Sequence, residues 1–254
     1  MSAGSCRIGV AGWGLSRAVA DWFPGSGTHL ERYAAVLPAV EINSCFYRHH
    51  RPGTYAKWAA GVPDGFRFSV KLPKAITHEA GLTVWEPVLG RFLDETASLG
   101  HKLGCVLVQL PPKLAFDAPA AAAFFRALRG RYAGALALEP RHPSWAAAEP
   151  EQLLRELGIA RVAADPARFP GADRPSGSER LVYYRLHGSP RIYHSEYSPE
   201  YLEGVARGLD EALGRGAEAW CIFDNTASGA AVGNAIALLA LLARMRRAGN
   251  QAGT

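Results

Sequence analysis

The sequence predicts an α/β fold, a single (β/α)8 TIM-like barrel, and three observations support this prediction. The chain has 254 residues, which is close to the usual length of such a barrel. Apolar strand-like runs alternate with helical segments along the chain, and this alternation indicates parallel strands. Almost every strand-like run ends in polar or ionisable residues, and the active sites of these barrels lie at the carboxyl-terminal ends of the strands.

The strand-like runs separate their side chains by type. In the third run, Phe68 and Val70 alternate with Arg67, Ser69 and Lys71. Because successive side chains of a strand point to opposite faces, one face of this run is apolar and the other is polar. Seven of the runs show a consistent parity of this kind. The predicted strands are Arg7–Gly12, Ala39–Ser44, Arg67–Leu72, Gly104–Leu110, Ala135–Arg141, Ile159–Asp165, Leu181–His187 and Ala219–Asn225.

Helical periodicity fills most of the intervals between these strands, and several of the helices are opened by Ser or Pro and closed by Gly. The predicted helices are Leu30–Leu37, Gly53–Ala60, Val88–Lys102, Pro119–Arg129, Pro150–Leu157, Pro199–Leu213 and Ala230–Arg246. The segment Pro166–Arg180 is rich in Pro and Gly and lacks a helical period, so a loop is expected in place of the sixth helix. We expect a single domain over residues 1–254, with its core at about 7–247.

An open, doubly wound sheet is the competing architecture. Gly9, Gly12 and Gly14 faintly resemble a dinucleotide-binding loop, but Arg17 stands where the third glycine of that motif belongs, and Trp13 interrupts the loop. The motif is therefore rejected, and the barrel is preferred.

Composition and charge limit the partners and the compartment. The net charge of +5 permits an anionic partner, but basic residues cluster only at Arg244, Arg246 and Arg247, so nucleic acid is kept as an alternative partner. The four cysteines have no paired spacing, as expected in a reducing compartment. The segment Met1–Arg7 does not resemble a leader, and the longest apolar run, Ala235–Ala243, is too short to span a bilayer. We expect a cytoplasmic protein without a membrane partner.

The polar strand ends together predict a functional site at one mouth of the barrel. A barrel needing only stability would hold Val or Leu there, because an uncompensated buried charge costs several kcal/mol. The candidate catalytic residues are Glu41, Lys71, Glu139, Asp165 and His187. The candidate substrate-binding residues are Asn43, Tyr47, His78, Gln109, Arg141, His142, Trp145, Arg185 and Asn225.

Two kinds of chemistry suit these residues. Glu41, Glu139, Asp165 and His187 could ligate a divalent metal, or they could act as general acids and bases. No cofactor is predicted, and the metal is the weaker alternative, because Lys71 and Arg185 on the same ring would repel a cation. Without a metal, His187 is the natural proton shuttle near neutral pH. Lys71 would bind an anion, or form a Schiff base if burial depressed its pKa.

Side chains beyond the strand ends suggest further contacts. Aromatic residues at these positions could stack on a sugar or base, or simply pack the loops onto the rim; they are Trp13, Phe46, Tyr47, Trp145, Tyr193 and Tyr197. The loops after the last two strands, at residues 188–191 and 225–229, lie where many barrels bind phosphate. A phosphorylated substrate is therefore one alternative among anionic ligands.

Several short motifs stand at or just after the predicted strands. They are Gly12-Trp13, Val40 to Ser44 with Phe46 to Arg48, Phe68 to Lys71, Ile76 to His78, Gln109 to Pro112, Glu139 to Trp145, Arg185 to Gly188 and Phe223 to Thr226. Together these motifs resemble the YecE-like family, the domain-of-unknown-function family 72, over residues of about 7 to 240. The resemblance implies a TIM-like barrel and supplies no reaction. Two positions depart from the usual pattern of the family: Cys45, where Thr is usual, and Asp224, where Asn is common.

Three hypotheses follow. The first is an enzyme that uses acid–base chemistry on a small polyhydroxylated or anionic substrate, by hydrolysis, isomerisation or lyase chemistry. The second is a nucleic-acid-binding or repair-nuclease-like barrel, motivated by the net charge and by Arg48 and Arg191 beside the rim aromatics. The third is a non-catalytic barrel that senses a ligand. The sequence predicts no oligomeric state.

Overall fold

The computed structural model describes residues 4–252, so residues 1–3 of the segment Met1–Arg7 lie outside it. Within this range the strands form one ten-stranded sheet in the order β7-β9-β10-β1-β2-β3-β4-β5-β6-β8. Every pairing is parallel except that of β8 with β6. The strands are β1 Cys6–Ala11, β2 Ala39–Ile42, β3 Arg67–Lys71, β4 Leu103–Gln109, β5 Ala135–Glu139, β6 Ile159–Arg161, β7 Ala163–Asp165, β8 Ser176–Gly177, β9 Leu181–Leu186 and β10 Glu218–Phe223.

The sheet closes into a barrel through β6 and β7, which only Val162 separates. β6 pairs with β5 on one side and β7 pairs with β9 on the other. The predicted strand Ile159–Asp165 is therefore one bent strand that changes partner in its middle. The predicted barrel is confirmed.

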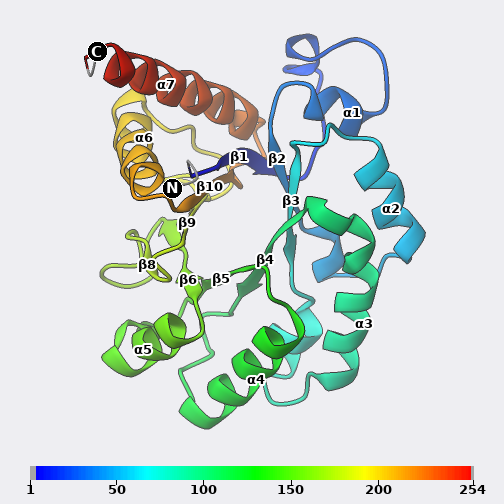
Figure 1. Cartoon of the computed structure of the whole chain (residues 1–254), viewed down its shortest axis with the longest axis vertical. Helices are drawn as coiled ribbons and strands as arrows, with labels where there is room; N and C mark the ends of the chain where they lie inside the picture. Colours follow the sequence, from blue (N-terminus) through cyan, green and yellow to red (C-terminus); the bar gives the residue numbers. More distant parts are fainter. Residues whose placement is uncertain (1–3, 253–254) are drawn as a thin grey trace.

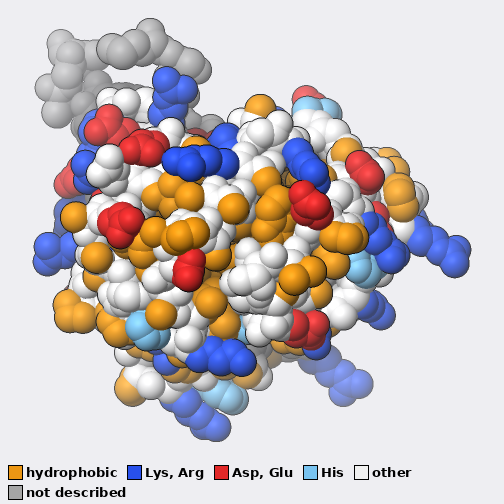
Figure 2. Space-filling model, turned by 90° about the horizontal axis from the view of Figure 1, so that it is seen from below, with side chains coloured by type: hydrophobic (Ala, Val, Ile, Leu, Met, Phe, Trp, Pro, Cys, Tyr) orange, Lys and Arg blue, Asp and Glu red, His pale blue; other side chains and the backbone are white. Residues whose placement is uncertain are grey.

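The helices surround the barrel, as the view along its axis shows (Figure 1). Seen from the side of α4 and α5, the outer surface carries basic and acidic side chains interspersed among hydrophobic ones (Figure 2). The helices are α1 His29–Ala34, α2 Pro52–Ala60, α3 Glu86–Thr96, α4 Ala118–Arg131, α5 Ala148–Glu156, α6 Pro199–Gly214 and α7 Ala230–Ala252. No helix in the described part of the chain has both the length and the apolar character required to cross a membrane.

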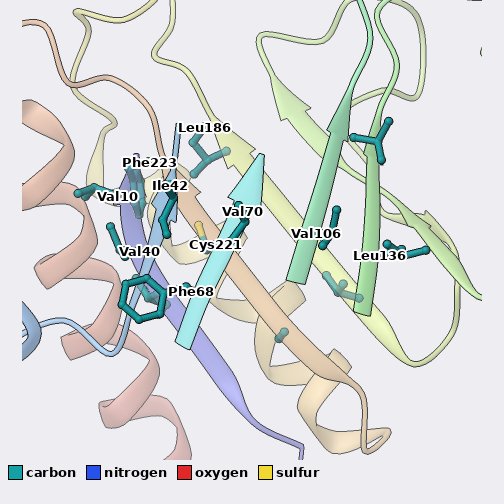
Figure 3. Close-up of a cluster of buried hydrophobic side chains, with 14 of the residues drawn as sticks. Val10, Val40, Ile42, Phe68, Val70, Val106, Leu136, Leu186, Cys221 and Phe223 are labelled. Carbon is teal, nitrogen blue, oxygen red and sulfur yellow. The ribbon is translucent and has the colours of Figure 1, made fainter. Parts of the chain in front are cut away.

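The two faces of the strands have different roles. Side chains such as Val40, Phe68 and Val70 belong to the large core that also contains the buried helix residues (Figure 3). The opposite parity fills the barrel interior, where the rings of Tyr183 and Trp220 stack with centroids 5.9 Å apart. The neighbours of these two large rings include the small side chains of Ala39, Cys105, Ala137 and Ala160.

Several elements differ from the predicted bounds. The predicted helix Val88–Lys102 ends as α3 at Thr96 and continues as a 3-10 segment in which Gly100 has a positive φ. A π-helical turn, Ala75–Glu79, follows β3. The predicted loop Pro166–Arg180 contains no helix but includes β8, where a Cβ on Gly177 would overlap the carbonyl oxygen of Ile159.

Candidate active site

Arg185 on β9 is the centre of a buried group of charges. Its Nε lies 3.1 Å from both carboxylate oxygens of Glu41, and its Nη2 lies 2.7 Å from Glu41 Oε1. Its Nη1 donates to Glu139 Oε2 over 3.1 Å, and its Nη2 is 3.0 Å from Asp224 Oδ2. Three strands of the barrel, β2, β5 and β10, thus direct one carboxylate each toward the same guanidinium group.

His187 and Arg141 extend this group. His187 Nε2 is 3.2 Å from Glu139 Oε1, and its Nδ1 is 3.1 Å from Asp224 Oδ2. Arg141 places both Nε and Nη2 at 2.8 Å from Glu139 Oε1. We call Glu41, Glu139, Arg141, Arg185, His187 and Asp224 the ion cluster.

The charges within the ion cluster shift the pKa values of Glu139 and His187. Burial opposes ionisation of Glu139, but Arg141, His187 and Arg185 outweigh burial and hold the pKa of Glu139 well below its ordinary value. Burial likewise opposes the imidazolium form of His187, yet Glu139 and Asp224 raise the pKa of His187 above 6.5. Glu139 therefore stays ionised, and His187 retains a proton to higher pH than a free histidine does.

A second set of buried hydroxyls lies beside Glu41. The Tyr183 hydroxyl donates to Glu41 Oε2 over 2.9 Å and lies 2.9 Å from Ser69 Oγ. Sequence reasoning did not select Tyr183 or Ser69 as site residues. The same alternation could have identified both, because Tyr183 lies two residues before Arg185, and Ser69 lies two residues before Lys71, on the same face of their strands.

Lys71 lies near the ion cluster but is bonded differently. Its Nζ stands 4.0 Å from the centroid of the Phe46 ring. Burial, together with Arg185, lowers the pKa of Lys71 to about 8, and the charges of Glu41, Glu139 and Asp224 offset only part of this shift.

His78 and Gln109 form the adjoining part of the mouth. Gln109 pairs in register with Glu139, and its Nε2 is 3.4 Å from His78 Nε2. Burial and the charges of Lys71 and Arg141 lower the pKa of His78 to about 4. His78 is therefore neutral at physiological pH and can exchange hydrogen bonds with an oxygen-rich ligand.

Asp165 and Asn225 lie outside the ion cluster. The Asp165 carboxylate accepts a hydrogen bond of 2.8 Å from the Tyr197 hydroxyl. The Asn225 amide donates over 2.9 Å to Ser195 O and also over 2.9 Å to the side chain of Asn234. Both side chains therefore hold the loop between β9 and α6, and the structure does not bring them to Glu139 and His187.

The remaining candidates occupy several environments. Trp145 is buried, and its indole N–H donates over 3.1 Å to Leu114 O, so this ring belongs to the core and not to the rim. His142 accepts from Ser144 N over 3.2 Å and thereby caps a short 3-10 helix. Tyr47 is 72% exposed. Asn43, directly after β2, has a buried amide oxygen for which the described residues provide no hydrogen-bond partner.

Tyr193 covers His187 from the loop after β9. The two rings meet edge to face with centroids 5.9 Å apart, and Tyr193 is 43% exposed. Its φ of +69° is in the left-handed region, which is costly for a residue with a large side chain. Backbone bonds hold it there, because Tyr193 N donates to His187 O and Tyr193 O accepts from Ala227 N.

The arrangement does not fit the alternative metal site formed by Glu41, Glu139, Asp165 and His187. Arg185 already bonds to the carboxylates of Glu41 and Glu139, and Asp165 is directed to Tyr197. Within residues 4–252, no three His, Cys, Asp or Glu side chains are grouped as metal ligands would be.

Cys45, the departure noted beside the second strand, is buried and directed to backbone oxygens. Its Sγ lies 3.1 Å from Ile42 O and 3.0 Å from Lys71 O. Burial raises the pKa of this thiol to about 12. Cys45 is consequently a packing residue and not a reactive thiolate.

Comparisons with known proteins agree with this architecture. Residues 7–253 match the family model described as "Protein of unknown function DUF72". A DUF72 family protein from Thermotoga maritima is similar in structure, with a TM-score of 0.78 and 25% identity over 94% of this chain and 99% of that one.

Two curated proteins are similar in sequence. The UPF0759 protein YecE of Escherichia coli K12 is 30% identical over 62% of this chain, and the matched segment spans 58% of the YecE length. The UPF0759 protein YunF of Bacillus subtilis is 24% identical over 92% of this chain and 94% of its own length. The match to the family model covers nearly the whole chain, and the fold agrees with that of a solved member, so this protein belongs to the DUF72 family.

Proposed function

We propose that the protein is an enzyme that moves protons on a small anionic or polyhydroxylated molecule at the carboxyl-terminal mouth of the barrel. The observation that supports this proposal best is the position of His187 between two ionised carboxylates, those of Glu139 and Asp224. A protein needing only stability gains little from such a buried group, because the desolvation of each ion costs several kcal/mol. Groups with perturbed pKa values in such a place are typical of active sites.

The charge balance favours an anionic substrate. The carboxylates of Glu41, Glu139 and Asp224 contribute three negative charges, and Lys71, Arg141 and Arg185 contribute three positive ones. The group is neutral when His187 is neutral and has one excess positive charge when His187 is protonated. An anion bound at the mouth would neutralise that excess, and it would favour the protonated form of His187 from which a proton is donated.

The residues divide the work by their bonding. The nitrogens of Arg185 are bonded to carboxylates, so Arg185 positions Glu41 and Glu139 and does not hold substrate itself. The Arg141 side chain is 12% exposed and can direct its guanidinium group to an anion. His187 then donates a proton as general acid and recovers one as general base, while Glu139 keeps its imidazole oriented.

The proposal is tested by incubating the protein with a metabolite mixture and following consumption by mass spectrometry. We expect His187→Asn to reduce kcat by roughly 100-fold or more, the usual contribution of a general acid or base. We expect Arg141→Met to raise KM for the same compound. Glu149→Gln, an exposed substitution on α5, is the matched control and should leave turnover unchanged. Unchanged turnover in His187→Asn, in a folded protein, would rule out the proposal.

Binding measurements separate the rival functions. A ligand-sensing barrel would bind a compound that the turnover experiment shows to be unconverted. A nucleic-acid-binding protein would bind duplex or single strands, and its affinity would fall steeply as salt rises.

A further inference from the structure

Two lysines of this chain are equally buried but differently bonded. Lys71 and Lys102 are each 8% exposed. Lys102 Nζ donates to the carbonyl oxygens of Ala59 and Val62 over 2.8 and 2.7 Å. For Lys71, the described residues provide no hydrogen-bond acceptor and no carboxylate within ion-pairing distance, and its Nζ faces the ring of Phe46. A buried ammonium group left in this state is costly, and selection for stability alone would not maintain it.

The charges around Lys71 come from four strands. Arg185 on β9 is the neighbouring cation, and the carboxylates of Glu41, Glu139 and Asp224 are already bonded to Arg185. Desolvation beside another cation is the arrangement that activates lysine amines as nucleophiles. Because these carboxylates are bonded to Arg185, they do not stabilise the charged form of Lys71 as a direct ion pair would.

We propose that Lys71 is an amine nucleophile that forms a Schiff base with an aldehyde or ketone substrate carrying an anionic group. This inference rests on the proposed function, because it uses the same mouth and the same proton donor. It adds the chemical class of the substrate and the atom that attacks it.

The covalent step balances with groups already present. The neutral Nζ attacks the carbonyl carbon, a C–N bond forms, and the carbonyl electron pair moves to oxygen, which takes a proton from His187. The nitrogen then gives a proton back to His187, which passes it to the carbinolamine hydroxyl, and water leaves as the C=N bond forms. The sum is one amine, one carbonyl and one proton giving an iminium ion and water. Hydrolysis reverses the sequence, so neither an oxidant nor a reductant is required.

The test is competitive reductive methylation with limiting formaldehyde and cyanoborohydride at pH 7, read by peptide mass spectrometry. Formaldehyde is the smallest carbonyl compound, so substrate identity is not needed. The amines that compete are Lys57, Lys71, Lys74, Lys102 and Lys113, together with the amino terminus. Lys71 is expected to react on the order of tenfold faster than exposed Lys57, because far more of Lys71 than of an ordinary lysine amine is neutral at this pH.

Two controls separate the effect of the site from sequence-specific labelling. Unfolding the protein in guanidinium chloride should abolish the difference between Lys71 and Lys57. Lys102 is the matched buried lysine and should react more slowly than Lys57 in the folded protein, because its protons are bonded to two carbonyls.

The outcomes distinguish this inference from the proposed function. Methylation of Lys71 no faster than that of Lys57 overturns the Schiff base even if His187→Asn abolishes turnover, and the acid–base proposal then stands alone. Fast methylation of Lys71 that slows in His187→Asn supports both. If turnover is unchanged in His187→Asn, the proposed function fails, and the Schiff-base proposal is rejected with the site on which it rests.

Discussion

Arg185 and Glu41 form a two-point ion pair deep in the barrel, with Arg185 Nη2 2.7 Å from Glu41 Oε1 and Arg185 Nε 3.1 Å from Glu41 Oε2. The pair joins β9 to β2 across the barrel interior. Removing one member of a buried pair leaves the other uncompensated, which is more costly than the pair is stabilising.

Glu41→Gln is therefore expected to lower the free energy of unfolding by about 3 kcal/mol. Glu149→Gln, on the surface of α5, should change it by less than about 0.5 kcal/mol. Urea unfolding of the three proteins measures both values. A loss below about 1 kcal/mol for Glu41→Gln would mean that Arg185 does not depend on Glu41 as the structure indicates.

The pKa of His187 provides a direct reading of its surroundings. Burial lowers this pKa, but Glu139 and Asp224 raise it by more than burial lowers it. Nitrogen-15 NMR of the imidazole should therefore give a pKa above 6.5. A pKa raised by folding stabilises the protein below about pH 6.5 and ceases to do so as pH rises through the folded-state value. Asp224→Asn should lower the pKa of His187 toward 6.5. A wild-type pKa below 6.5 would show that burial outweighs the two carboxylates.

The acidic side of the stability profile depends on Glu139 and Asp224. Arg185 and His187 outweigh the burial of Asp224 and lower its pKa, and the pKa of Glu139 is lowered as well. Carboxylates with lowered pKa values stabilise the fold above about pH 4 and lose this contribution as pH falls through their folded-state pKa values. Thermal unfolding of wild type and Asp224→Asn should therefore differ at pH 7 and converge in strong acid. A difference independent of pH would contradict this explanation.

Lys71 has the opposite effect on stability. Its pKa of about 8, compared with 10.5, means that the charged form is disfavoured in the folded state. The destabilisation is absent above about pH 10.5, grows as pH falls, and is complete below about pH 8. Lys71→Met should thus raise the free energy of unfolding at pH 7 by up to about 3 kcal/mol, and the gain should shrink at alkaline pH. Destabilisation by Lys71→Met at every pH would show that the ammonium group is well compensated.

Much of the barrel could be predicted from the alternation of apolar and polar residues in the strands, and so could the largest part of the candidate site. Glu41, Lys71, Glu139 and Arg185 share the parity that points into the barrel, and the structure places all four at one mouth. That Arg185 bonds to carboxylates from three other strands could not be predicted, because it depends on how the barrel closes through the bend at Val162.

Alternation also explains two of the candidates that the structure places elsewhere. In the bent strand, Ala160, Val162 and Ala164 point inward, so Asp165 faces outward, where Tyr197 lies. In β10, the parity of Trp220 and Ile222 selects Asp224 and excludes Asn225. Strict use of the parity would have excluded Asp165 and would have chosen Asp224 in place of Asn225.

Loop residues were less predictable. Trp145 follows β5 at a distance where no periodicity applies, and whether an aromatic ring lies on the rim or in the core depends on neighbours from other elements. Here Phe116 and Phe125 pack against it and enclose it in the core.

Ligand-induced thermal stabilisation tests most directly whether the ion cluster binds a small anionic molecule. A panel of anionic and polyhydroxylated metabolites is screened in parallel against wild type, Arg141→Met and the exposed control Arg131→Met. We expect compounds that stabilise wild type and Arg131→Met equally and Arg141→Met far less. Equal stabilisation of all three proteins would contradict binding of an anion at the ion cluster.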